Sequence, residues 1–187
     1  MFCINYQIIL HDYDAAPGES GHFQILCGPL RYGEFWPPEI ATQMATDRLQ
    51  SWFLPLAEAL LALKEDGYAA FIDVERYRGW LEFTYADGLV RVNIADAGAN
   101  EKPFFLRKGR AERFPDDVPR EFPDDLSCSY RQLRDEVAEK TTRYLSEIHR
   151  LSPSLFSGSG AINSEQKAFL ADIGKLESML ADMARLD

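Results

Sequence analysis

Two stretches of alternating side chains, joined by Asp87 and Gly88, restrict the fold of this chain most strongly. Residues 80–85 alternate Trp, Glu and Thr with Leu, Phe and Tyr, and residues 89–95 alternate in a similar way. A period of two places successive side chains on opposite faces of a β-strand. Asp and Gly accept the positive φ angles of a tight hairpin turn. These residues therefore predict an antiparallel hairpin and, with it, a fold built on a β-sheet.

Other parts of the first hundred residues have strand patterns too. Residues 2–12 and 22–28 alternate apolar side chains, and the Gly- and Pro-containing stretch at 15–21 between them predicts a hairpin with a long loop. Residues 30–36 could continue as a bent edge strand. Residues 68–75 are apolar enough for a central strand.

One long helix is predicted between these strands, over about 38–65. Its apolar residues follow a helical spacing and include Trp52, which we expect in the core. Pro55 removes a backbone donor, so it should kink the helix or split it near Ser51. The element order is then β-β-α-β-β-β. It predicts an α+β fold in which one antiparallel sheet of about five strands has one helix packed across it.

Two helices are predicted to end the chain as an antiparallel hairpin. The first runs to about Leu151, with Ser127 or Ser129 as its cap, and the second follows Asn163, which begins a capping-box pattern. The sequence leaves open whether this hairpin packs on the sheet, projects from it or mediates dimerisation. We therefore divide the chain into a sheet domain, 1–126, and a helical hairpin, 127–187, as parts of one compact unit.

Residues 96–126 differ from the rest because they are rich in proline and charge. The motif Phe-Pro-Asp-Asp occurs twice, at 114–117 and 122–125. We expect a long ordered loop with its phenylalanines fixed on the body of the protein, since loops of this length are often functional. One hypothesis makes it an acidic surface for a basic partner, formed by Asp116, Asp117, Glu121, Asp124 and Asp125. The alternative is a solvated linker whose last acids favour the start of the next helix.

The net charge, the apolar stretches and the cysteines of the chain indicate its class of partner and its compartment. The formal net charge is -10, which argues against nucleic acid as a partner and favours a basic protein. No apolar stretch approaches the ~20 residues that span a bilayer, and the N-terminal residues do not resemble a signal peptide. Three widely spaced cysteines form no CxxC pair. We expect a cytoplasmic protein with reduced thiols and no membrane contact.

No catalytic, cofactor or metal motif stands out, so we expect a non-catalytic protein without a cofactor. Trp36, in a loop-like segment, is the best candidate for an aromatic anchor at a partner interface. The alternative is a metal-dependent or hydrolytic enzyme. It would be centred on His11, Asp12, Asp14 and His22. A second alternative is an adaptor that dimerises through the C-terminal helices.

The first half of the chain resembles the immunity proteins of bacterial contact-dependent growth inhibition and polymorphic toxin systems. The resemblance lies in residues 33–38, in the helix that contains Trp52, and in residues 79–88, whose sequence is Gly-Trp-Leu-Glu-Phe-Thr-Tyr-Ala-Asp-Gly. It implies a cytoplasmic protein that binds a cognate toxin domain and blocks it. Many such toxins are basic nucleases, which an acidic inhibitor would match in charge.

Overall fold

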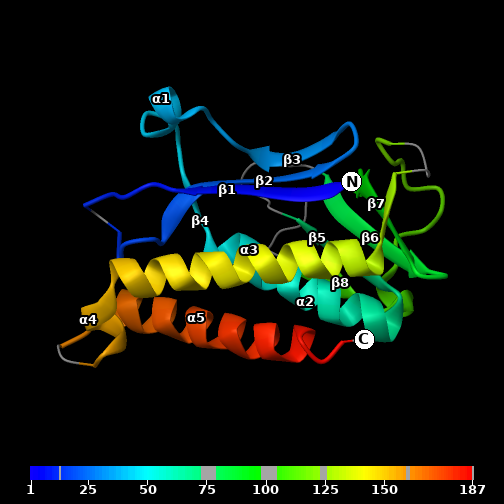
Figure 1. Ribbon diagram of the computed structural model, residues 1–187. Coiled ribbons are helices and arrows are strands. Elements are labelled where there is room, and N and C mark those ends of the chain that lie inside the picture. Colours follow the sequence, from blue (N-terminus) through cyan, green and yellow to red (C-terminus); the bar gives the residue numbers. More distant parts are fainter. Residues whose placement is uncertain (13, 73–78, 98–104, 123–125, 159–160, 187) are drawn as a thin grey trace. The chain divides into compact units, whose positions relative to one another are not determined.

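The computed structural model shows an α+β protein (Figure 1). It describes residues 1–12, 14–72, 79–97, 105–122, 126–158 and 161–186. The chain divides into two compact units, each of which is described by itself below. The first unit contains residues 1–3, 25–32 and 55–136, and the second contains residues 4–24, 33–54 and 137–187.

The first unit contains an antiparallel sheet of five strands in the order β8-β5-β6-β7-β9. The strands are β5 (Tyr68–Ile72), β6 (Trp80–Ala86), β7 (Leu89–Ala95), β8 (Phe105–Lys108) and β9 (Ser127–Ser129). The predicted hairpin is confirmed, because β6 pairs with β7 along its whole length. Asp87 and Gly88 form its turn with φ angles of 53° and 79°, the backbone conformation that these two residue types tolerate best.

Helices pack across this sheet. The part of α2 (Gln50–Asp66) in the first unit buries Leu56, Leu60 and Leu63 completely or almost completely. Tyr130, the first residue of α3 (Tyr130–Leu151), donates a hydrogen bond from its hydroxyl to the Leu60 carbonyl at 3.2 Å. Its ring also lies 5.2 Å from the ring of Tyr85 on β6. The predicted α+β class and the five-stranded antiparallel sheet are confirmed.

The composition of the sheet differs from the prediction in two places. Residues 105–108 pair with β5 as strand β8, so this part of the Pro-rich stretch is not a loop. Its four residues are too few to show a periodicity, which explains why the sequence did not reveal the strand. Strand β5 ends at Ile72, and the last three residues of the strand predicted over 68–75 lie outside the described residues.

The two N-terminal strands belong to a second, four-stranded sheet and not to the five-stranded one. Its order is β1-β2-β3, with β4 paired to β2. The strands are β1 (Phe2–Ile8), β2 (Ser20–Cys27), β3 (Leu30–Glu34) and β4 (Asp47–Arg48). The strands themselves were predicted correctly. Alternation reveals that a segment is a strand but not which strands it will pair with.

The helix predicted over 38–65 is two helices, α1 (Pro38–Ala41) and α2, separated by strand β4. The continuous helix is therefore wrong, although a break near Ser51 was expected and α2 begins at Gln50. Asp47 explains the interruption, since its carboxylate accepts a hydrogen bond from the Trp52 indole at 3.2 Å while its backbone pairs with Gly21. Pro55 is accommodated inside α2.

Stacked aromatic rings form the core of the second unit. The ring of Phe23 lies 5.1 Å from that of Trp52, and the ring of Phe53 lies 4.7 Å from that of Tyr144. All four side chains are fully buried, so the prediction that Trp52 lies in the core is confirmed. Ring pairs of this kind stabilise a core by ~0.5–1.5 kcal/mol beyond their buried area.

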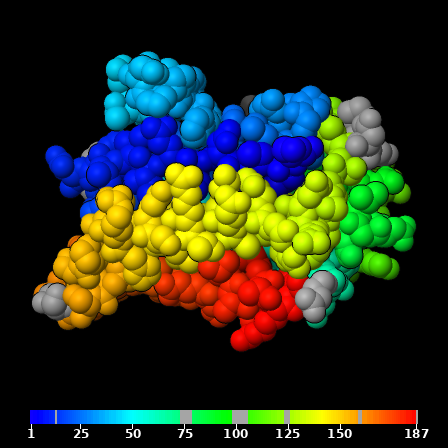
Figure 2. Space-filling model, viewed as in Figure 1, coloured from blue at the N-terminus to red at the C-terminus, as the bar shows by residue number. Residues whose placement is uncertain are grey.

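The C-terminal helices have the predicted hairpin-like arrangement. The short helix α4 (Pro153–Phe156) follows α3 in the chain and leads to α5 (Ser164–Met183). Figures 1 and 2 show α3 in yellow next to α5 in red. His149 of α3 contacts Glu177 of α5 at 2.8 Å. None of the helices in the described part of the chain has the length and apolar character needed to cross a membrane.

Both predicted caps are present. The Ser129 hydroxyl accepts a hydrogen bond from the Gln132 backbone at 3.1 Å, and the Gln132 side chain accepts one in return from the Ser129 backbone. Asn163 and Gln166 form the same reciprocal box at the start of α5. Each box satisfies backbone N–H groups that the first turn of a helix leaves without partners.

Replacing Gly21 with alanine should destabilise the protein by about 3 kcal/mol. A Cβ at this position on β2 would meet the Gln7 carbonyl oxygen and would lie 2.8 Å from the Leu49 side chain, so backbone has to shift. Gly174→Ala is the matched control, because a Cβ on this α5 residue has no atom within 4 Å and alanine favours a helix by about 0.5–1 kcal/mol. Urea denaturation measures both changes, and equal stability of the two variants would contradict the close approach at Gly21.

Candidate functional site

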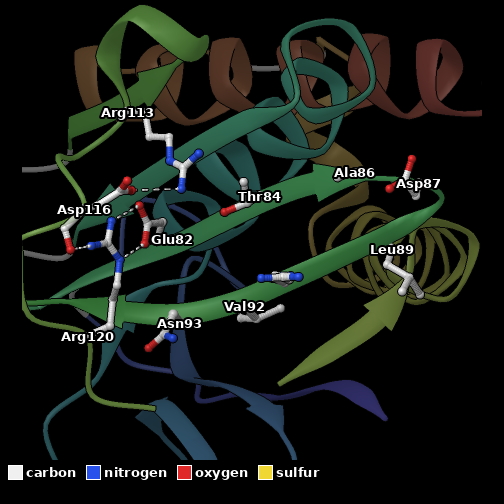
Figure 3. Close-up of a pocket in the computed structure, with 11 residues that line it drawn as sticks. Glu82, Thr84, Ala86, Asp87, Leu89, Val92, Asn93, Arg113, Asp116 and Arg120 are labelled. Atoms are coloured by element: carbon white, nitrogen blue, oxygen red, sulfur yellow. Dashed lines mark hydrogen bonds and ion pairs between the residues drawn. The ribbon is translucent and has the colours of Figure 1, made fainter. Parts of the chain in front are cut away.

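The most distinctive surface feature is a loop that is tied tightly to the five-stranded sheet. We call residues 113–122 the acidic loop. Arg120 in this loop makes a two-pronged ion pair with Glu82 on β6, with Nε 2.9 Å from one carboxylate oxygen and Nη2 3.1 Å from the other (Figure 3). The Glu82 side chain is 5% exposed and that of Arg120 is 16% exposed. Hydrogen bonds to Glu82 raise the pKa of Arg120, so its charge is secure.

Arg120 also holds the backbone of the acidic loop in its turn. Its Nη1 donates to the carbonyl oxygens of Val118 at 2.7 Å and Pro115 at 3.0 Å. Two of the residues in this turn are prolines, which lack a backbone N–H, so the turn has few donors of its own for these carbonyls. One guanidinium therefore fixes both the shape of the loop and its position on the sheet.

Phe114 provides a second, apolar anchor. Its side chain is 4% exposed, and its ring lies 5.3 Å from the ring of Trp80 on β6 in an edge-to-face arrangement. The Arg107 guanidinium lies 4.5 Å above the Phe114 ring, a distance at which a cation is attracted to the ring face. The Phe114 backbone N–H donates to the Tyr68 hydroxyl at 3.3 Å. The prediction that phenylalanines fix this loop to the body is confirmed at Phe114.

Phe122, the phenylalanine of the second motif copy, is held through its backbone. Asn93 on β7 donates to the Phe122 carbonyl at 2.7 Å and accepts from the Phe122 backbone N–H at 3.0 Å. Nearby, the Glu121 backbone N–H donates to the Ile94 carbonyl at 2.9 Å. The loop is thus fastened at both ends, by Phe114 and by Phe122, with Arg120 between them.

The carboxylates of the acidic loop point outward. Asp116, Asp117 and Glu121 are all exposed, whereas Asp124 and Asp125 lie outside the described residues. Asp116 accepts a hydrogen bond from Arg113 at 3.3 Å, but its side chain is 92% exposed, and such pairs contribute little to stability. Arg120 is paired with Glu82 on the sheet, and its charge also interacts with the Asp116 carboxylate.

A polar pocket of about 620 Å³ lies between the acidic loop and the exposed face of β6 and β7 (Figure 3). Its floor consists of three cross-strand pairs, Glu82 with Asn93, Thr84 with Arg91, and Ala86 with Leu89. Its wall consists of the loop residues Arg113, Asp116 and Arg120. No sequence motif revealed this pocket. The alternation of Glu82, Thr84 and Ala86 was the available signal, because it placed these side chains on one face.

Three of the four residues of the alternative enzyme site, His11, Asp14 and His22, have structural partners. Asp14 accepts hydrogen bonds from the Ser20 hydroxyl at 2.7 Å and from the His11 backbone at 3.3 Å. His22 is buried, with Nε2 2.9 Å from the Ala41 carbonyl oxygen, and Asp12 is exposed. Over the described ranges, no group of three or more His, Cys, Asp or Glu side chains is arranged to hold a metal ion.

Trp36, the predicted aromatic anchor, belongs to the second unit and is partly buried. Its indole N–H donates to a Glu34 carboxylate oxygen at 3.4 Å. Two apolar residues beside it in sequence are exposed, Phe35 by 38% and Ile40 by 39%. This short segment thus offers apolar side chains to solvent, as an interface requires.

The three cysteines should differ sharply in reactivity. Cys27 and Cys128 are buried, and burial raises the pKa of both thiols, that of Cys128 to about 12, whereas Cys3 is partly exposed. The thiolate is the reactive form, and it is scarce at pH 8 for both buried residues. We expect a thiol reagent at that pH to modify at most one cysteine rapidly in the native protein and all three in denaturant. Two or more rapid modifications of the native protein would contradict the burial.

No protein-family model matches the chain, and the same is true of curated proteins and of solved structures.

Proposed function

We propose that the chain is a non-catalytic binding protein that acts in the cytoplasm and neutralises a basic toxin domain by docking its acidic loop on that domain. The observation that carries this proposal is the combination of exposure and anchoring in the loop. Asp116, Asp117 and Glu121 are exposed, while Arg120 and Phe114 hold the backbone that carries them.

Anchoring favours binding because it lowers the cost of ordering. A loop that is already held in one conformation loses little conformational freedom when a partner arrives. Two prolines and the Arg120 hydrogen bonds to Pro115 and Val118 supply that order here. Exposed carboxylates on such a loop attract a basic partner and accelerate its approach.

The charge and the sequence of the chain indicate the class of its partner. The net charge of -10 favours a basic partner, and the resemblance of residues 33–38 and 79–88 to immunity proteins suggests a toxin domain such as a nuclease. Trp36, with Phe35 and Ile40 exposed near it, is proposed as an apolar contact in the same role. Asp124 and Asp125 continue the acidic sequence of the loop and are proposed as further contacts.

Co-expression with the toxin domain encoded by a neighbouring gene tests this function. We expect the chain to rescue growth and to co-purify with the toxin domain. The variant Asp116→Lys/Asp117→Lys/Glu121→Lys should lose both abilities. The matched control changes three exposed acids elsewhere by the same charge, Glu65→Lys/Glu139→Lys/Glu165→Lys, and should retain them. Rescue by the loop variant at the level of the control would overturn the proposed role of the loop.

A further inference from the structure

The pocket between the acidic loop and the sheet has features of a small-molecule site. We propose that it binds a small organic anion through a carboxylate or phosphate group, with Arg91 on its floor and Arg113 on its wall as the cationic ligands. The proposal concerns the cavity between the loop and the sheet, which shares Asp116 with the proposed toxin contacts, and its test uses Arg91 and Arg113, which are not among those contacts.

The size and the lining of the pocket suit a small molecule. A volume of about 620 Å³ lies within the range of roughly 300–1,000 Å³ that is typical of small-molecule sites. Thr84 and Ala86 are small, so the floor beside Arg91 is left open. Thr84 is the direct cross-strand partner of Arg91, which places a hydroxyl group next to the base of the arginine.

Some polar groups that line the pocket already have partners. Glu82 is neutralised by Arg120 in the two-pronged ion pair, and the Asn93 side chain is engaged by the backbone of Phe122. These groups form the frame of the pocket. They hold its walls and leave Arg91, Arg113, Asp87 and Asp116 as the other charged groups of the lining, of which the two arginines can bind an anion.

Arg91 and Arg113 are the arginines of the lining that an anion can reach. Arg91 is exposed, and its guanidinium has no ion pair with any residue in the described part of the chain. Among the described residues, the Arg113 guanidinium pairs with the Asp116 carboxylate alone, at 3.3 Å. The Asp116 side chain is 92% exposed, so an incoming anion can replace it at little cost. Guanidinium groups suit carboxylate and phosphate because their N–H donors form paired hydrogen bonds with two oxygens.

Binding of citrate and of inorganic phosphate, measured by amide chemical shifts in low-salt buffer, tests the proposal. We expect at least one of these probes to bind with a Kd on the order of 1 mM or tighter and to shift the amide signals of β6 and β7 around Thr84 and Arg91. Arg91→Gln should weaken binding about tenfold, which corresponds to about 1.4 kcal/mol. Arg113→Gln should weaken it in the same direction.

Arg131→Gln is the control, since it removes the same charge from an exposed position on α3 that does not line the pocket. It should leave the Kd unchanged within about twofold. The far-UV circular dichroism spectra show whether each variant is folded, and the exposure of Arg91 makes Arg91→Gln a mild change. Failure of both probes to bind the wild-type protein, or an equal Kd for Arg91→Gln and Arg131→Gln, would overturn the proposal.

Discussion

Replacing Arg120 with alanine should lower the free energy of unfolding by about 3–5 kcal/mol, because it leaves the Glu82 carboxylate buried without its counter-ion. Glu82 has a side-chain exposure of only 5%, and it depends on Arg120 for two short charge-assisted hydrogen bonds. The carbonyls of Pro115 and Val118 would each lose the hydrogen bond from Arg120 as well. The acidic loop should therefore become mobile while the rest of the sheet is weakened.

Two controls separate this effect from a general loss of positive charge. Arg113→Ala removes an arginine from the same loop, but among the described residues its side chain pairs only with the exposed Asp116, so stability should change by no more than about 0.5 kcal/mol. Adding Glu82→Gln to Arg120→Ala should recover part of the lost stability, since the uncompensated buried charge is removed. Urea denaturation measures all three variants. Equal stability of Arg120→Ala and Arg113→Ala would show that Arg120 does not fix the loop.

Replacing Phe114 with alanine should cost about 3–5 kcal/mol, the range for removing a buried phenylalanine. The ring is 4% exposed and lies against Trp80 and the Arg107 guanidinium, so its loss leaves a cavity and removes one ring that this cation faces. The core around it also contains Tyr68 and Ile72 of β5. Thermal unfolding gives the change in stability.

Phe35→Ala is the matched control for Phe114→Ala, because its side chain is 38% exposed. It should change stability by less than about 1 kcal/mol. Limited proteolysis adds a local readout. The Phe114→Ala protein should be cut within the acidic loop at a protease concentration that leaves the Phe35→Ala protein intact. Protection of the loop in both variants would mean that the Phe114 ring is not its anchor.

Local patterns in the sequence predicted those elements whose structure is determined locally. The β6–β7 hairpin followed from alternation around Asp87 and Gly88, and the α3 and α5 starts followed from Ser129 and Asn163. Each of these depends on contacts between residues close in the chain, which a sequence pattern records directly.

Features that depend on long-range pairing were missed. The two-residue strand β4 exists because Asp47 pairs with Gly21, which is far away in the sequence. Two residues are too few to show the alternation by which a strand is predicted. The separation of β1 and β2 into their own sheet has the same origin. Pairing partners of a strand are chosen by tertiary packing, which overrides local propensity.

The sequence indicated the loop of the candidate site, but not the ion pair that holds the loop or the pocket beside it. The repeated Phe-Pro-Asp-Asp motif pointed to this loop, whose carboxylates at 116 and 117 are exposed, and their role as a partner surface stays a prediction. The pairing of Arg120 with Glu82 joins residues 38 positions apart, and the pocket forms from side chains on two strands and a loop. Neither leaves a local signal, because the residues are brought together only by the sheet.

The rate of association with a basic toxin domain, measured at increasing salt, tests the central claim most directly. The account predicts that the association rate constant of the wild-type chain falls steeply between low and physiological salt, since screening shortens the reach of the loop carboxylates. The Asp116→Lys/Asp117→Lys/Glu121→Lys variant should bind at least about a hundredfold more weakly, and Glu65→Lys/Glu139→Lys/Glu165→Lys within a few-fold of wild type. A rate that does not depend on salt, with equal affinities for the two variants, would contradict the account.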